Sequence, residues 1–133
     1  MLLGELRASF QWGILLITDE GSKDPIPDWT TGADQITGSR SSIVIKIRHE
    51  VDGPALVRVW DAEPPSPGAI TDERVLTIAS GILQISDALV DQAVRVPITT
   101  SLVRVKLIRS EPVYASEIDI VVEMESGPHD LAR

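Results

Sequence analysis

Cysteine is absent from the 133 residues of this chain, and histidine occurs only twice. The lack of cysteine excludes disulfide scaffolds, cysteine nucleophiles and thiolate metal sites together. Two histidines are too few for a histidine-rich metal centre. We therefore expect a protein that holds no cofactor and no resident metal.

Long apolar runs are also missing. The longest run near the start is Ile14-Leu15-Leu16-Ile17, far short of the roughly 20 residues that span a bilayer. Glu5 and Arg7 interrupt the region where a secretory signal needs a sustained apolar stretch. The sequence therefore predicts a cytoplasmic protein with no membrane partner.

Positive charge is scarce, because 12 Lys and Arg stand against 20 Asp and Glu and leave a net charge of −8. An acidic surface repels phosphate backbones and anionic lipids, so direct binding to nucleic acid or to a membrane is disfavoured. The same surface suits a basic protein partner. Apolar residues make up 43% of the chain, enough for a real core.

Alternation with a period of two dominates the chain. In 43–48 the odd positions are all isoleucine, while Lys46 and Arg48 fall on the other face. Further short runs rich in β-branched residues lie at 55–60, 75–78, 82–85, 93–96, 102–109 and 118–123. These runs predict an all-β fold, an antiparallel β-sandwich of about eight short strands with little or no helix. We expect a single β-sandwich domain over 1–124 and a flexible C-terminal tail over 125–133.

The segment 6–18 is predicted to form one long strand, bent by a bulge at Gly13. Phe10 and Trp12 would then share a face of that strand, because side chains two residues apart point the same way. Both aromatic residues are therefore expected in the core.

A segment of about 24 residues, 19–42, is predicted to be a long loop rich in proline and glycine. Loops longer than ~12 to 15 residues are usually functional or disordered. It carries five carboxylates, at Asp19, Glu20, Asp24, Asp28 and Asp34. They are consistent with a contact to cations of a partner, with a calcium site, or with solubility alone, although the spacing of a calcium-binding loop is absent.

Trp29 follows Asp28 in the middle of this polar segment. A tryptophan in such a loop either anchors an interface, where this residue type is over-represented, or tucks back and pins the loop onto the sandwich. The second role is the favoured one, since a loop of this length needs an apolar pin.

Catalytic constellations are not evident. A serine triad needs a histidine base oriented by a carboxylate, but His49 and Glu50 are adjacent on a predicted strand and point to opposite faces. His129 lies in the predicted tail, and neither a nucleophile elbow nor a phosphate-binding glycine motif is present. We therefore expect a protein that is not an enzyme.

Three segments in order carry a family resemblance. Ser9-Phe10-Gln11 in the first strand is followed by Pro27-Asp28-Trp29-Thr30 in the acidic loop and then by Ile43-Val44-Ile45. This order is similar to the competence protein J family, small acidic bacterial proteins that inhibit the DNA-entry nuclease during transformation. The resemblance implies an inhibitor of a basic bacterial nuclease, and at the level of residues it extends to Asp28 and Trp29.

Two functional hypotheses follow. The first is a small acidic regulatory protein that occludes a cationic surface, for instance of a nuclease, with a partner-binding site of Asp19, Glu20, Asp24, Asp28, Trp29 and Asp34. The second is a non-catalytic ligand-binding or oligomeric β-sandwich module, with calcium dependence left open. An apolar surface of Leu56, Trp60, Leu76 and Ile78 would favour self-association, and a homodimer stays open.

Overall fold

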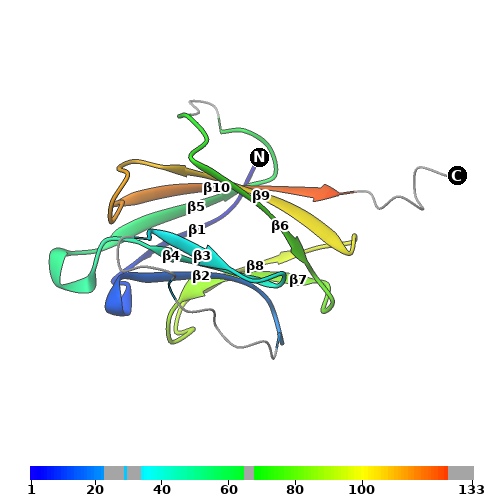
Figure 1. The fold of residues 1–133 in the computed structure, drawn as a ribbon, viewed down its shortest axis with the longest axis horizontal. Helices are drawn as coiled ribbons and strands as arrows, with labels where there is room; N and C mark the ends of the chain where they lie inside the picture. Colours follow the sequence, from blue (N-terminus) through cyan, green and yellow to red (C-terminus); the bar gives the residue numbers. More distant parts are fainter. Residues whose placement is uncertain (23–28, 30–33, 65–67, 126–133) are drawn as a thin grey trace, which may run out of the picture.

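The computed structural model describes residues 1–22, 29, 34–64 and 68–125. Within these residues, two five-stranded sheets pack face to face and two short 3₁₀ helices lie at one end (Figure 1). No α-helix occurs in the described part of the chain. The predicted all-β sandwich with little or no helix is therefore confirmed. The elements are β1 (Leu2–Ala8), η1 (Gln11–Gly13), β2 (Ile14–Asp19), β3 (Ile36–Gly38), β4 (Ser42–Lys46), η2 (Glu50–Asp52), β5 (Ala55–Trp60), β6 (Asp72–Thr77), β7 (Ile82–Asp87), β8 (Ala93–Pro97), β9 (Leu102–Arg109) and β10 (Glu117–Glu125).

The strand order is β1-β5-β10-β9-β6 in the first sheet, which we call sheet A, and β3-β4-β2-β7-β8 in the second, sheet B. Neighbours run antiparallel except for β5 and β10, which pair in parallel with Val57 opposite Ile118. This one pair departs from the predicted antiparallel pairing. Parallel strands need a long connection between them, and the chain from β5 to β10 provides it by visiting both sheets.

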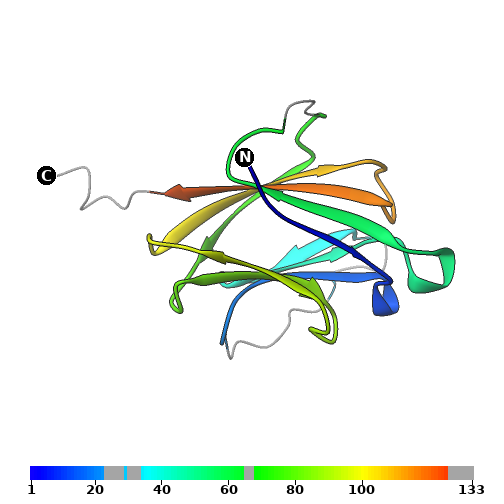
Figure 2. The same ribbon diagram turned by 180° about the vertical axis from the view of Figure 1, so that it is seen from behind.

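The core lies between the sheets and follows from the period-two alternation. Ile43, Ile45 and Ile47 are fully buried, and so are Val103, Val105 and Leu107 on the facing sheet. At one side of the sandwich the edge strands β1 and β8 approach each other (Figure 2). A Cβ added to Gly4 of β1 would lie 2.6 Å from Cγ1 of Val94 in β8, so the missing side chain lets the two sheets meet there.

The prediction of one bent strand over 6–18 is wrong. The chain leaves sheet A after Ala8, turns through η1, and enters the middle of sheet B as β2. Because the turn breaks the alternation, Phe10 is fully buried while Trp12 is 63% exposed. Trp12 is therefore not a core residue.

The predicted loop 19–42 contains a short strand, since β3 pairs antiparallel with β4 and places Thr37 opposite Val44. Period-two analysis misses it because three residues are too few to show alternation. At the other end of the domain, β10 reaches Glu125, one residue into the predicted tail. The residues from 126 onward lie outside those described.

The apolar surface expected to favour self-association is not exposed. Leu76 and Ile78 point into the core, where they are 1% and 4% exposed. Leu56 lies on the outer face of sheet A but is also buried. The neighbouring outer face is partly covered near Gly68, where an added Cβ would lie 3.0 Å from Cγ2 of Ile108. Trp60 is half-buried, and its Nε1 donates to Asp119 at 2.9 Å. These four residues therefore do not form one exposed apolar surface, and the homodimer stays a prediction.

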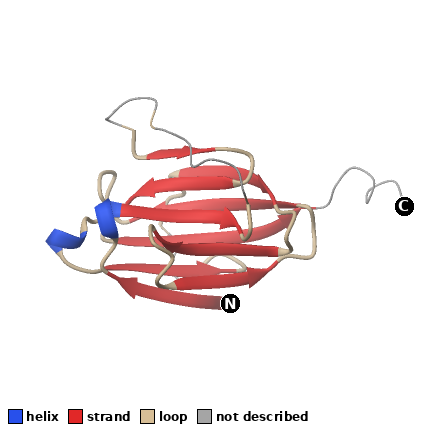
Figure 3. Ribbon diagram, turned by 90° about the horizontal axis from the view of Figure 1, so that it is seen from below, coloured by secondary structure: helices blue, strands red, loops and turns tan. Residues whose placement is uncertain are grey.

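The two ends of the sandwich differ. One end carries η1, η2 and the connections 88–92 and 110–116, and we call it the loop end (Figures 1 and 3). β2 begins at the loop end and finishes at the opposite end, at Asp19. We call this second end the Asp19 end.

Candidate functional site

The residues predicted from the sequence to bind a partner are divided between the two ends. Asp19 and Glu20 lie at the Asp19 end, where β2 finishes. Trp29 lies against Lys46, and Asp34 precedes Gln35, whose carbonyl oxygen accepts a hydrogen bond from the Lys46 backbone. Lys46 ends β4 at the loop end. Asp24 and Asp28 fall outside the described residues.

Asp19 is a buried carboxylate that holds a turn in place. It is 7% exposed, and its two oxygens accept hydrogen bonds from the backbone N–H of Ala79 (3.0 Å) and Ser80 (3.1 Å). The Ser80 hydroxyl donates a third bond of 2.5 Å. These bonds join β2 of sheet B to the connection between β6 and β7, so this carboxylate is engaged within the fold.

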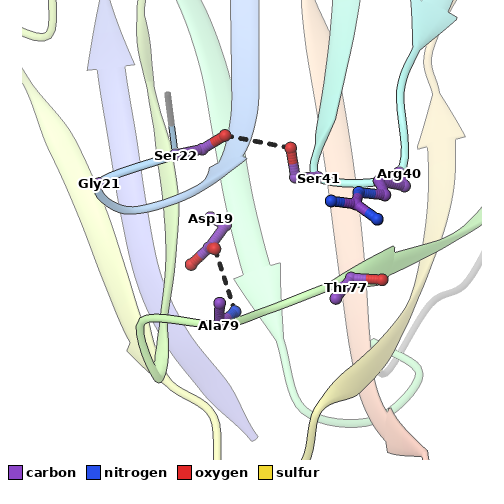
Figure 4. Close-up of a pocket in the computed structure, with 7 residues that line it drawn as sticks. All are labelled: Asp19, Gly21, Ser22, Arg40, Ser41, Thr77 and Ala79. Atoms are coloured by element: carbon purple, nitrogen blue, oxygen red, sulfur yellow. Dashed lines mark hydrogen bonds between the residues drawn. The ribbon is translucent and has the colours of Figure 1, made fainter. Parts of the chain in front are cut away.

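A hollow of about 240 Å³ lies beside this carboxylate (Figure 4). Its wall includes Arg40 and Thr77, and the hydroxyls of Ser22 and Ser41 lie 3.1 Å apart at its rim. Asp19 lines the hollow, and its carboxylate already accepts the hydrogen bonds of the 79–80 turn.

Glu20 forms an exposed ion pair with Arg95 of β8, at 2.6 Å between carboxylate oxygen and Nε. Both side chains are partly in solvent, and such pairs contribute at most about 1 kcal/mol. A cationic partner could replace Arg95 at small cost. The fold therefore holds Glu20 less firmly than Asp19.

Trp29 packs against the outer side of sheet B, with the Lys46 ammonium 4.7 Å from its ring centroid. The distance is that of a cation–π contact, and Lys46 is only 8% exposed. The tryptophan itself is half-buried. This geometry agrees with the pinning role favoured by the sequence.

The outer face of sheet A carries a network of ion pairs. β9 supplies Arg104 and Lys106, and β5 supplies Arg58; within the described residues these three cations contact five carboxylates, Glu73, Glu117, Asp119, Glu123 and Glu125. These three basic residues of the strands therefore face solvent and are paired, as the alternation predicts. The carboxylates outnumber the cations, so the face stays acidic.

Two of these cations are held firmly in the charged state. The hydrogen bond to Glu123 raises the pKa of Lys106, and its Nζ lies 2.6 Å from a Glu123 oxygen. The hydrogen bond and charge of Glu125 likewise raise the pKa of Arg104. Both side chains therefore stay protonated near neutral pH and neutralise carboxylates of the neighbouring strands.

The loop end presents apolar side chains to solvent. Trp12 of η1 is 63% exposed and Val51 of η2 is 80% exposed. The connections next to them add Leu89, Val90, Val113 and Tyr114, all of them exposed. Exposed apolar residues are ordinary singly, but gathered on one end they mark a surface that another molecule can cover.

Local hydrogen bonds fix these loops. The His49 ring accepts from the Val51 backbone N–H at 3.2 Å and caps η2. Glu111 accepts bonds from the Ser116 hydroxyl, the Ser116 backbone and the Ser110 hydroxyl, and the first of these is the main cause that lowers the pKa of Glu111. The 110–116 connection is therefore held by hydrogen bonds between its own residues.

One of the two histidines lies in the part of the chain that the structure describes, and it serves the fold. His49 is used as a helix cap, and His129 lies outside the described residues. No group of three or more His, Cys, Asp or Glu that could hold a metal ion occurs among the residues described. Over the same residues, no helix has the length and apolarity needed to cross a membrane.

Sequence reasoning missed the loop end. The alternation predicts Trp12 to be in the core, and it gives no signal for Val51 or Tyr114 because turn residues follow no period. The available signal was local, since Glu50-Val51-Asp52 places an apolar residue between two acids directly before a Gly-Pro turn. An apolar residue in such a setting has no strand face on which to be buried.

No protein-family model matches this sequence, and the search of curated proteins gave no match either. Among solved structures, the chain is similar to the crystal structure of ComJ from Bacillus subtilis, an inhibitor of the DNA degrading activity of NucA. The TM-score is 0.70 at 9% sequence identity, over 94% of this chain and 98% of that chain. The resemblance to the competence protein J family is therefore confirmed at the level of the fold.

Proposed function

We propose that this protein is a non-catalytic inhibitor that binds a basic DNA-degrading nuclease and occludes its cationic surface. The observation that carries the proposal is the likeness to the nuclease inhibitor ComJ over nearly the full length of both chains. The match covers 94% of this chain and 98% of that chain, so the likeness extends over the whole sandwich. On this proposal the chain acts by binding the nuclease.

The charge supports this function. A nuclease binds DNA through cations, so a competitor for the same surface gains from being anionic. The net charge of −8 and the acidic excess on the outer face of sheet A would steer the encounter. Glu20, Asp24, Asp28 and Asp34 contribute to that field, whereas Asp19 holds the 79–80 turn.

The test is a titration of the purified chain into a DNA-degradation assay with NucA from Bacillus subtilis. We expect the rate of degradation to fall in proportion to added chain and to vanish near equimolar amounts. An unrelated acidic protein of matched net charge serves as the control and should leave the rate unchanged. A mobility-shift assay with DNA and the chain alone excludes sequestration of the substrate. Undiminished degradation at a large molar excess would overturn the proposal.

A further inference from the structure

The exposed apolar residues of the loop end come from four connections that are far apart in the sequence. Trp12 lies in η1, Val51 in η2, Leu89 and Val90 between β7 and β8, and Val113 and Tyr114 between β9 and β10. Figure 1 shows these connections gathered at the same end of the sandwich. The fold thus gathers side chains that the sequence scatters.

Hydrogen bonds and strand pairing place these connections side by side. Glu50 N–H donates to the Phe10 carbonyl at 3.2 Å, which places η2 beside η1. Arg48 N–H donates to the Ala115 carbonyl at 2.9 Å, and Tyr114 N–H donates to Oε1 of Gln35 at 3.0 Å. β7 pairs with β2 and sets Asp87 opposite Leu15, so the 88–92 turn lies next to η1.

The same surface holds unfavourable backbone conformations. Among the described residues, the non-glycine residues with positive φ are Trp12 (58°), Val90 (57°) and Tyr114 (47°), and all three are exposed apolar residues of the loop end. Such conformations are uncommon outside glycine and cost of order 1 to 3 kcal/mol each. A solvated turn would relieve this cost with glycine or asparagine. Large apolar side chains in strained, exposed turns are typical of binding surfaces.

The charged residues around this apolar surface indicate the class of partner that fits it. Four acids, Glu50, Asp52, Asp91 and Glu111, stand exposed around the apolar residues, against two cations, the exposed Arg7 and the half-buried Arg48. An apolar centre inside an acidic rim is complementary to an apolar pocket within a basic surface. A second copy of this chain would bring like charges together at the rim and is disfavoured.

We propose that the loop end is the surface on which a basic partner protein docks, with Trp12, Val51 and Tyr114 as its apolar anchors. The inference rests on the proposed function and centres the contact on residues outside the predicted 19–34 segment, of which Trp29 and Asp34 lie at this same end. Aromatic anchors ringed by polar residues are typical of binding hot spots. The acidic rim then sets the orientation of the partner and accelerates the encounter.

The experiment measures the inhibition constant toward NucA for wild-type chain and for two kinds of variant. Val51→Lys places a charge at the centre of the loop end, and Val75→Lys makes the same change at a 44% exposed valine of β6 in sheet A. Trp12→Gly and Tyr114→Gly remove the anchors while supplying the residue that a left-handed backbone favours. Their free energies of unfolding should therefore equal or exceed that of the wild type.

We expect Val51→Lys, Trp12→Gly and Tyr114→Gly each to weaken inhibition about tenfold or more, and Val75→Lys to change it less than about twofold. Wild-type inhibition that survives in all three loop-end variants would overturn this inference and leave the inhibitor function standing. A wild-type chain that does not inhibit NucA would overturn the proposed function and this inference with it. If sedimentation shows a dimer that Val51→Lys dissociates while inhibition is unchanged, the surface joins two copies and the inference is wrong.

Discussion

At the scale of single residues, the carboxylates of this acidic chain have different roles. Asp19 is buried with three hydrogen-bond donors around it, whereas Glu20, its neighbour in sequence, stands in a solvated ion pair. A hydrogen bond to a charged group contributes about 1.5 to 3 kcal/mol, and an exposed ion pair at most about 1 kcal/mol. Adjacent acids can therefore differ in whether they stabilise the fold or face a partner.

Asp19→Asn tests this assignment. The amide cannot accept with both of its heavy atoms, so the free energy of unfolding should fall by about 1 to 3 kcal/mol in denaturant titrations. Glu20→Gln is the matched control and should lose less than about 1 kcal/mol. If Asp19→Asn is as stable as wild type but loses nuclease inhibition, Asp19 is a contact residue and not a turn anchor.

The stability of the 110–116 connection should depend on pH through the carboxylate of Glu111. Its pKa lies below the ordinary value of 4.5, chiefly because the Ser116 hydroxyl donates to the carboxylate. A group whose pKa is lowered by folding stabilises the fold above its unfolded pKa, and that contribution is lost as pH falls through the folded pKa. The connection that carries Tyr114 should therefore loosen in acid.

The prediction compares wild type with Glu111→Gln in unfolding titrations from neutral pH to about pH 3. The wild type should be the more stable of the two at neutral pH, and the difference should shrink as the pH falls below 4.5. Equal stability of the two proteins at every pH would show that the hydrogen bonds to Glu111 do not stabilise the fold.

At the scale of elements, η1 decides how the sandwich is connected. It carries the chain from the edge of sheet A to the middle of sheet B, and Gly13 ends it with a φ of 64°. A Cβ at this position would lie 2.9 Å from the Ile47 carbonyl oxygen. Glycine is required here both by the left-handed backbone and by the close approach of β2 to the chain after β4.

Gly13→Ala should consequently destabilise the protein more than Gly21→Ala. Gly21 also has a left-handed backbone, with a φ of 83°, but nothing lies within 4 Å of an added Cβ. We expect Gly21→Ala to cost about 1 to 2 kcal/mol and Gly13→Ala at least about 1 kcal/mol more, from the backbone clash. Denaturant midpoints of the two variants measure the difference. Equal midpoints would show that the clash is relieved by movement of the turn.

At the scale of the whole molecule, charge and shape have separate roles. The net charge of −8 acts over distance and is spread over strands, turns and loops. The apolar loop end acts only on contact and determines which surfaces fit. Long-range charge changes mainly the rate of association, whereas buried apolar anchors change mainly the rate of dissociation.

Salt separates the two contributions. The association rate constant with NucA should fall roughly tenfold or more between about 0.05 M and 0.5 M salt, and the dissociation rate constant should change much less. Surface plasmon resonance with immobilised nuclease measures both constants. An association rate constant insensitive to salt would argue against electrostatic steering by the acidic surface.

The sequence by itself determined the fold class and most of the strands. The segments 55–60 and 102–109 were located to the residue, because one face of each strand is buried and the period of two is an unavoidable consequence of the pleat. The excess of acidic residues also predicts a basic partner, which the inhibition assay tests. These properties are local or compositional, so they can be read without knowing which strands meet.

Tertiary structure decided the rest. Residues 6–18 look continuous, yet the chain changes sheets at η1, because burial on two facing sheets outweighs a single long strand. Asp19 is a turn anchor only because the chain at 79–80 returns to it from the other sheet. Trp12, Val51 and Tyr114 form one surface for the same reason. A contact between residues distant in the sequence leaves no periodic trace in either segment, and it arises only when the sheets pack.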